Sequence, residues 1–162
     1  MISDRTTKEI NAQINRELYS AYLYLAMSSD AMYKGFKGAA AWFAVQFQEE
    51  QGHALRFVKY LQDQNAKVEL GAIAAPKKEW KDLLDMFQAT LAHEKGITAS
   101  LGKLMVLAAA EKDFATQGLL QWFINEQVEE EANDAEVIWM LEMASGSKGA
   151  LFMADKKLGD RK

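Results

Sequence analysis

Apolar side chains recur at helical spacing along most of the chain. In the first segment, Ile10, Ile14, Ala21 and Tyr24 lie three, four or seven residues apart, so they share one face of a helix. The same pattern predicts four long helices and a short fifth helix, over residues 6–33, 39–65, 79–110, 114–145 and 150–154. The fold class is therefore predicted to be all-α.

Turn-forming residues separate these helices in an uneven way. Short turns at residues 34–38 and 111–113 join the first helix to the second and the third to the fourth. The one long connection, residues 66–78, contains the only proline, Pro76, and we expect an extended piece within it at residues 68–70. Two short turns and one long crossover predict two helical hairpins packed as a four-helix bundle.

An internal repeat supports the two-hairpin organisation. A shift of 77 residues maps one set of polar residues onto another, namely Glu17, Glu49, Glu50 and His53 onto Glu94, Glu126, Gln127 and Glu130. Apolar residues follow the same shift, for example Phe43 onto Leu120. Such repeats are typical of two copies of one unit, each of which needs the other to bury its apolar face.

The repeated polar residues fall within the apolar stripes of their helices. Glu50 and His53 are three residues apart and share a face, as the ligands of a metal ion would. Glu17 and Glu50 lie about 18 and 15 residues from the first turn, so they differ in height by about one helical turn. Glu94 and Glu130 stand in nearly the same relation to the second turn. All four helices can therefore bring these side chains to one level of the bundle.

Carboxylates in such a place need compensating cations. No residue three or four positions from Glu17, Glu94 or Glu130 is basic, so facing carboxylates would repel one another. The alternative, in which each glutamate faces solvent, would require the apolar faces of four helices to be misassigned. A ligand set with many oxygens, one imidazole nitrogen and no sulfur suits iron or manganese better than structural zinc.

Composition limits the other classes of function. A length of 162 residues with 49% hydrophobic content fits a single domain, residues 1–162, with a sizeable core. The net charge of −4 gives no basic surface for nucleic acid, and the absence of cysteine excludes thiolate catalysis, iron–sulfur clusters and disulfides. No apolar run is long enough for a membrane span or a signal peptide, so we expect a soluble, cytoplasmic protein.

Four motifs resemble those of bacterial non-haem ferritins, within the ferritin-like di-iron carboxylate family. They are Glu-Leu-Tyr-Ser-Ala-Tyr-Leu-Tyr-Leu from Glu17, Glu-Glu-Gln-Gly-His from Glu49, Ala-His-Glu-Lys around Glu94 and Asn-Glu-Gln-Val-Glu-Glu-Glu from Asn125. The resemblance covers the whole chain. It implies one iron site formed by Glu17, Glu50 and His53 and a second formed by Glu50, Glu94 and Glu130. Glu50 would bridge the two ions, and Gln127 would lie in the outer shell near the second.

The resemblance also implies a third iron site, formed by Glu49, Glu126, Glu129 and Glu130. Glutamate runs such as residues 129–131 are often solvated helix faces, so a surface role is the alternative.

Three aromatic or imidazole side chains near the motifs have two interpretations each. Tyr24 resembles the family tyrosine that bonds a site carboxylate and takes part in electron transfer, but it could equally be a core tyrosine. Trp122 is expected in the core rather than as a redox partner. His93 precedes Glu94 and points about 100° away from it on the helix, so we expect it on the surface.

The function implied by the resemblance is iron storage and detoxification. Fe(II) would be oxidised by dioxygen or peroxide, and the ferric product would be stored as mineral in a homo-oligomeric cage of about 24 subunits. The short fifth helix, residues 150–154, would line the four-fold axis of that cage. Gly52 stands where bacterioferritins place a haem-binding methionine, so haem is not expected. The alternatives are a di-iron enzyme acting on an organic substrate or peroxide and an inert interaction bundle.

Overall fold

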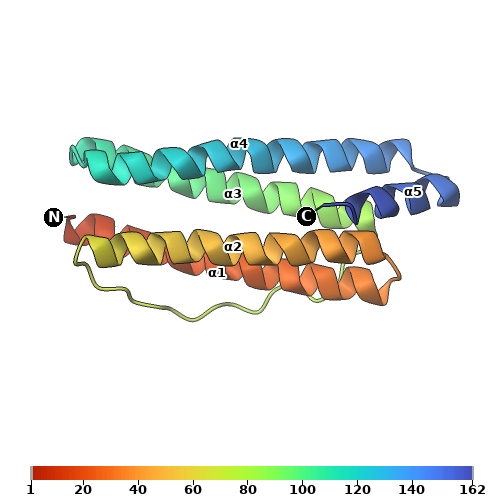
Figure 1. Ribbon diagram of the computed structural model, residues 1–162, viewed down its shortest axis with the longest axis horizontal. Helices are drawn as coiled ribbons and strands as arrows, with labels where there is room; N and C mark the ends of the chain where they lie inside the picture. Colours follow the sequence, from red (N-terminus) through yellow and green to blue (C-terminus); the bar gives the residue numbers. More distant parts are fainter. Residues whose placement is uncertain (1, 162) are drawn as a thin grey trace.

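The computed structural model describes residues 2–161 and confirms the all-α prediction. Within these residues the helices are α1 (Asp4–Tyr33), α2 (Lys37–Asp63), α3 (Leu83–Ala110), α4 (Phe114–Met143) and α5 (Lys148–Leu158). The helices α1 and α2 form one hairpin, α3 and α4 form the other, and the two hairpins pack lengthwise (Figure 1). The short helix α5 follows α4 at one end of the bundle and packs mainly against α2.

Four of the helices begin at a side-chain cap. The oxygen of the capping residue accepts a hydrogen bond from the backbone N–H three residues further on, in the cases of Ser3, Asp82, Asp113 and Ser147. The cap at Asp82 corrects the predicted start of the third helix, which begins at Leu83 and not at residue 79. Before it, the buried Trp80 donates its backbone N–H to the Asp30 carboxylate at 3.0 Å, and this bond holds the residue outside the helix.

The start of α2 depends on α5. Phe36, which precedes α2, provides no side-chain cap. Instead, the Asp155 carboxylate of α5 accepts the N–H groups of Gly38 at 3.1 Å and Ala39 at 2.8 Å, where a negative charge also complements the helix dipole. The second helix therefore begins at Lys37, two residues earlier than predicted. The fifth helix is longer than the predicted residues 150–154, because docking on α2 extends it to Leu158.

The long connection between α2 and α3 runs beside the first hairpin over most of its length (Figure 1). The side chain of Asn11 bonds the carbonyl of Lys67 at 2.9 Å and the N–H of Glu69 at 2.8 Å. Asn15 donates to the carbonyl of Ala72 at 3.2 Å. The extended piece predicted at residues 68–70 lies in this connection and joins no sheet. Side chains of α1 instead bond three backbone groups of the connection, those of Lys67, Glu69 and Ala72.

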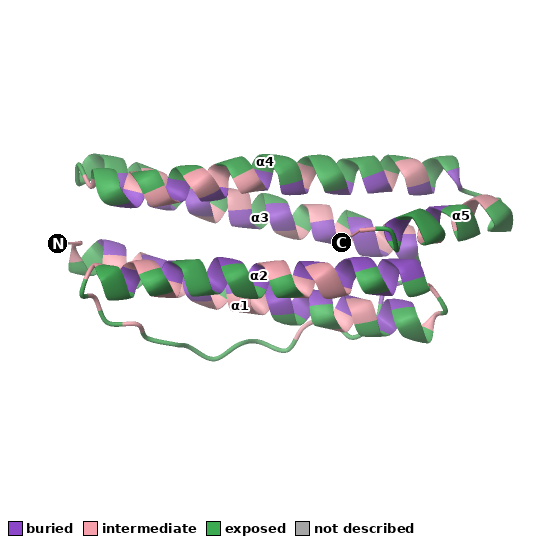
Figure 2. Cartoon of the chain, viewed as in Figure 1, coloured by how far each residue is buried: buried purple, intermediate pink, exposed green. Residues whose placement is uncertain are grey.

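The core consists of two apolar clusters, one toward each end of the bundle. One contains Tyr24, Phe43 and Phe87, and the other contains Phe57 and Phe123, whose rings stack with centroids 4.0 Å apart. Buried residues line the facing sides of the long helices, and exposed residues cover the outside (Figure 2). The candidate metal ligands fall between the two clusters in sequence on every long helix. In residues 2–161 no helix is both long and apolar enough to cross a membrane.

The close approach of α2 and α5 gives a first prediction. A Cβ atom at Gly38 would lie 1.6 Å from the Asp155 carbonyl oxygen, so Gly38→Ala forces the backbones of the two helices apart. We expect a loss of about 2 kcal/mol or more in unfolding free energy, together with faster amide exchange in α5. Gly118→Ala in α4 is the control, because its Cβ meets open space and should stabilise by about 0.5–1 kcal/mol. Unchanged exchange of α5 in Gly38→Ala would contradict the prediction.

Candidate metal centre

The four long helices each contribute a buried polar side chain at mid-bundle. The set comprises Glu17 of α1, Glu50 and His53 of α2, Glu94 of α3, and Gln127 and Glu130 of α4, none more than 7% exposed. Each helix places these residues on its apolar stripe, so the packing that buries the stripe also buries them. The level predicted from the turns therefore corresponds to a real layer in the bundle.

Glu17, Glu50 and His53 form the tightest group. One ligand atom from each lies within 4.8 Å of the others, and His53 Nδ1 is 3.4 Å from a Glu50 oxygen. In residues 2–161 no other group of three or more histidine or acidic side chains brings its ligand atoms within 4.8 Å of one another, as a shared metal ion would require. Gln13 donates to Glu17 at 2.6 Å and fixes its carboxyl group. Phe123 packs edge-on against the His53 ring, with centroids 5.7 Å apart.

Glu94 and Glu130 are held by hydrogen bonds. Glu94 accepts from the Tyr24 hydroxyl and from Gln127 Nε2, the latter at 2.9 Å. Glu130 accepts from Gln46 Nε2 at 2.8 Å. These neutral donors reduce the repulsion between the carboxylates without filling the space between them.

Burial and mutual repulsion raise the pKa values of the acidic groups. Burial raises the pKa of Glu17 well above its usual value, and the charge of Glu50 adds to the effect. The pKa of Glu50 is also raised well above normal, by burial and then by the charge of Glu94. Burial and Glu94 raise the pKa of Glu130 to about 7. A cation entering this layer would therefore displace protons from carboxyl groups as well as bind oxygen atoms.

The four residues of the predicted third site border one cleft between α2 and α4. Its volume is about 640 Å³, and its walls include Glu49, Glu126, Glu129 and Glu130. His53 also reaches this cleft, so the cleft adjoins the Glu17–Glu50–His53 group. Glu129 is exposed and Glu126 is partly buried. The arrangement thus gathers the predicted residues at one place, with an opening to solvent.

Tyr24 has features of both interpretations made from the sequence. It is fully buried, with its ring 6.1 Å from that of Phe43, and its hydroxyl donates to Glu94. Burial and the charge of Glu94 raise the Tyr24 pKa well above its usual value. Trp122 is partly buried and packs edge-on against His53, with centroids 5.6 Å apart.

The prediction for His93 was wrong, because this side chain is partly buried between α1 and α3. Its Nε2 lies 2.7 Å from Ser20 Oγ, and its ring centroid is 5.8 Å from that of Tyr19 and 6.0 Å from that of Tyr24. Burial lowers its pKa. His93 points about 100° away from Glu94 on α3, and this direction faces the neighbouring helix α1 rather than solvent. The geometry of a single helix does not show whether a given direction faces another helix or solvent.

Sequence reasoning missed several polar residues around the centre. Gln46 and Asp134 are each four residues from a predicted ligand, Glu50 and Glu130, so helical spacing could have identified both. Arg161 has no such signal, because only the chain after α5 brings it there. Asp134 is fully buried, and neither carboxylate oxygen has a hydrogen-bond partner among residues 2–161. Burial, and then the charge of Glu94, raises its pKa to about 8.

Buried carboxylates from the four helices of two hairpins, with one Glu-x-x-His pair, define a helical bundle with a carboxylate-rich candidate metal centre. The comparison with protein families is more specific. The ferritin-like domain of the Ferritin family matches residues 7–144, and the chain belongs to this family. This assignment places it among iron-storage proteins and confirms the resemblance seen in the motifs.

Individual relatives cover nearly the whole chain. It is 36% identical to a bacterial non-heme ferritin of Campylobacter jejuni over 156 residues, covering 96% of this chain and 93% of that protein. It is 34% identical to a bacterial non-heme ferritin of Staphylococcus aureus over 161 residues, covering 99% and 97%. Among solved structures, an open pore ferritin from Archaeoglobus fulgidus matches with a TM-score of 0.99 at 40% identity, covering 100% of both chains. A closed form of that ferritin engineered by mutagenesis matches with a TM-score of 0.98 at 39% identity, covering 100% of this chain and 99% of that one.

Asp134 gives a prediction about the pH dependence of stability. An unfolded chain ionises an aspartate near pH 4, whereas in the folded protein Asp134 keeps its proton up to about pH 8. The folded state therefore binds more protons between these values, so Asp134 makes unfolding easier as pH rises. We expect Asp134→Asn to be more stable than the parent at pH 8, by about 1–3 kcal/mol, with the gain shrinking toward pH 5.

Denaturant unfolding of the metal-free protein at several pH values measures this difference. Asp85→Asn is the control, because a hydrogen bond from the Lys81 N–H lowers the Asp85 pKa. That variant should gain nothing at high pH. A pH-independent effect of Asp134→Asn would show that the side chain is already ionised in the folded protein.

Proposed function

We propose that this ferritin oxidises Fe(II) with dioxygen at the mid-bundle centre and stores the ferric product. The observation that carries the proposal is the convergence of Glu17, Glu50 and His53 within 4.8 Å in a buried layer that also contains Glu94 and Glu130. Oxygen ligands with one imidazole suit iron, and the similarity to bacterial non-heme ferritins supports the same metal.

The residues divide into two iron sites. Glu17, Glu50 and His53 hold the first ion, and Glu50, Glu94 and Glu130 hold the second, with Glu50 bridging the pair. For the second ion, Glu94 and Glu130 exchange hydrogen bonds from Gln127 and Gln46 for a metal contact. Each Fe(II) ion supplies one electron, and together they reduce dioxygen to the level of peroxide.

The surrounding residues position the ligands and handle protons. Gln13 holds Glu17, Gln127 holds Glu94 until the second ion binds, and the Tyr24 hydroxyl orients Glu94 through its other oxygen. Because burial raises the pKa values of Glu17, Glu50 and Glu130, binding of iron expels protons from the centre. Tyr24 is also close enough to the centre to take part in electron transfer.

The cleft bordered by Glu49, Glu126, Glu129 and Glu130 is the third iron site in this proposal. It lies beside His53 and opens to solvent, so it provides a route between the buried pair and the exterior of the bundle. The same cleft disfavours the alternative of a di-iron enzyme acting on an organic substrate. An apolar substrate would need an apolar pocket beside the metals, and the walls of this space carry four carboxylates and two guanidinium groups beside Leu55 and Trp122.

Storage requires a container, which we propose to be a hollow cage of about 24 copies of this chain. The outer surface carries exposed apolar side chains on several helices, among them Tyr33, Phe114, Trp139 and Phe152. Such side chains suit contacts between copies. Sizing of the purified protein tests this part, because a small oligomer that leaves added iron to precipitate would contradict it.

Glu17 on α1 provides the central test of the proposal. Replacing Glu17 with leucine removes a buried carboxyl group whose pKa burial has raised. We therefore expect the metal-free Glu17→Leu protein to be as stable as the parent or more stable, by up to about 2 kcal/mol, with the lost Gln13 bond limiting the gain. Rapid Fe(II) oxidation should disappear, because Glu50 and His53 alone would hold the first ion weakly.

Denaturant unfolding and stopped-flow oxidation measure the two effects on one variant. Glu142→Leu, at an exposed position of α4, is the control and should change neither by much. Normal oxidation kinetics in Glu17→Leu would exclude the proposed first site, whatever its stability.

The third site is tested separately by Glu49→Ala combined with Glu126→Ala. Fast oxidation of the first two ions should persist, because neither residue belongs to the proposed pair. The number of Fe(II) ions oxidised per dioxygen should change, since the third ion loses two of its ligands. Oxygen consumption measured with known iron additions gives this ratio. A ratio identical to that of the parent would assign both residues to a merely solvated face.

A further inference from the structure

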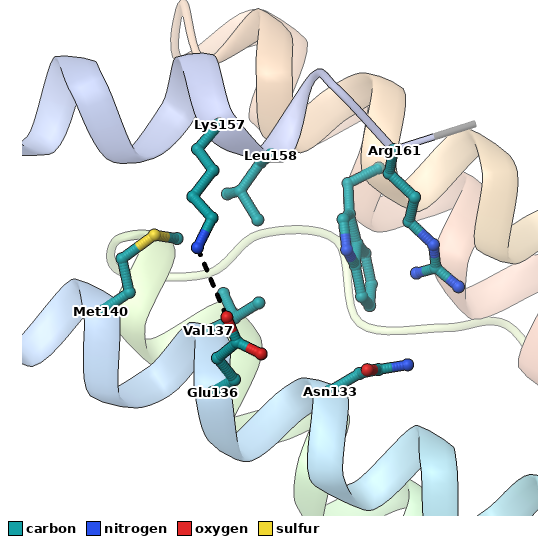
Figure 3. Close-up of a pocket in the computed structure, with 8 residues that line it drawn as sticks. Asn133, Glu136, Val137, Met140, Lys157, Leu158 and Arg161 are labelled. Atoms are coloured by element: carbon teal, nitrogen blue, oxygen red, sulfur yellow. Dashed lines mark hydrogen bonds and ion pairs between the residues drawn. The ribbon is translucent and has the colours of Figure 1, made fainter.

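Arg161 places a positive charge on the wall of the carboxylate cleft, the cleft lined by Glu49, Glu126, Glu129 and Glu130. Its Nη2 donates to Glu49 Oε2 at 2.6 Å, and its side chain is only 20% exposed. The guanidinium carbon lies 4.3 Å from the centroid of the Trp42 ring, in a cation–π arrangement. In Figure 3 the side chains of Lys157 and Arg161 extend from the last part of the chain, α5 and the segment after it. Arg161 is thus fixed by a ring on one side and a carboxylate on the other.

The positive charge of Arg161 also acts on two carboxyl groups that it does not bond. It lowers the pKa of Glu130 and of Asp134, opposing the larger effect of burial at both groups. Its second terminal nitrogen, Nη1, is buried without a hydrogen-bond partner in the part of the chain that the structure describes. A guanidinium group with an unused buried donor is bound less firmly than a fully paired one. Arg161 therefore compensates the acidic cleft and yet can be displaced.

We propose that Arg161 is a tethered counter-ion that competes with the third iron ion for Glu49. This inference rests on the proposed third site. The same Glu49 oxygen cannot accept the Arg161 N–H and bind a metal ion at full strength, so each weakens the other by an equal factor. Iron at Glu49 releases the guanidinium, and the Trp42 ring retains it nearby. When the ion leaves, Arg161 bonds Glu49 again.

The consequence is a third site that binds iron only transiently. The ligands of the first ion are not contacted, because Arg161 bonds Glu49 and none of Glu17, Glu50 or His53. A weak third position suits an ion in transit, since tight binding would block the cleft that adjoins His53. Arg161 thus tunes how long an ion stays in the cleft, and its hydrogen bond acts on Glu49 and on no ligand of the buried pair.

The test compares Arg161→Gln with Lys157→Gln in the intact, metal-free assembly. Both variants remove one positive charge from the pocket drawn in Figure 3, where Lys157 pairs with Glu136 at 3.3 Å. Lys157 does not line the carboxylate cleft. Calorimetric titration with Zn²⁺, a probe without redox chemistry, counts the bound ions and gives their affinities. We expect the third ion to bind about three- to ten-fold more tightly in Arg161→Gln and as in the parent in Lys157→Gln. Arg161→Lys should fall between them.

Amide exchange provides a second readout. Zinc saturation of the parent should accelerate exchange in the segment after α5, residues 159–161, and Glu49→Ala should abolish this response to zinc. An unchanged third affinity in Arg161→Gln would overturn the inference and leave the third site in place. A third ion seen only in Arg161→Gln would support it in its strongest form. Two ions in parent and variant alike would overturn both the inference and the third site, while the two-ion centre would stand.

Discussion

The burial of several carboxyl groups at one level of the bundle is the constraint on which the rest of this structure depends. Glu17, Glu50, Glu94 and Glu130 come from four helices and are all buried in one layer. Ionised groups in such a layer repel one another and lose hydration, a cost of several kcal/mol each when nothing compensates it. In the metal-free protein, retained protons and amide or hydroxyl donors provide the compensation. A buried layer of carboxyl groups that destabilises the metal-free fold in this way is expected where a bound cation compensates their charges.

The apolar clusters on either side of the layer offset the destabilisation that the buried carboxyl groups cause. Ring packing such as that of Phe57 on Phe123 and of Phe43 on Phe87 holds the helices together above and below the carboxyl groups. Marginal stability leaves room for only a few uncompensated polar groups, and these are concentrated in and around the one layer. The long helices therefore hold the candidate ligands in place. Because the apolar clusters supply the stability of the bundle, the polar centre does not have to contribute to it.

Periodicity predicts local structure and the faces of helices well, and it predicts contacts between elements poorly. The four long helices and the shared level of Glu17, Glu50, Glu94 and Glu130 follow from apolar spacing and distances to the turns. The start of α3, the cap that Asp155 places on α2 and the burial of His93 depend on a partner distant in sequence. No residue near Arg161 in the sequence indicates that it reaches Glu49. The candidate ligands were thus accessible to sequence reasoning, whereas the residues that support and restrain them were mostly not.

The departure from exact repetition between the hairpins has a physical meaning. The first hairpin supplies Glu17, Glu50 and His53 already close together, because a histidine next to a carboxylate attracts it when protonated and causes little repulsion when neutral. The second hairpin supplies Gln127 and Glu130 at the equivalent positions of α4, and Gln127 donates to Glu94 rather than standing free. Under the proposed function, a first ion meets preassembled ligands, while a second must break hydrogen bonds from Gln46 and Gln127. The charge of the first ion offsets that cost, because it removes the repulsion that made Glu50 and Glu94 unfavourable neighbours. Filling of the two sites is therefore ordered, and the asymmetry of the repeat produces that order.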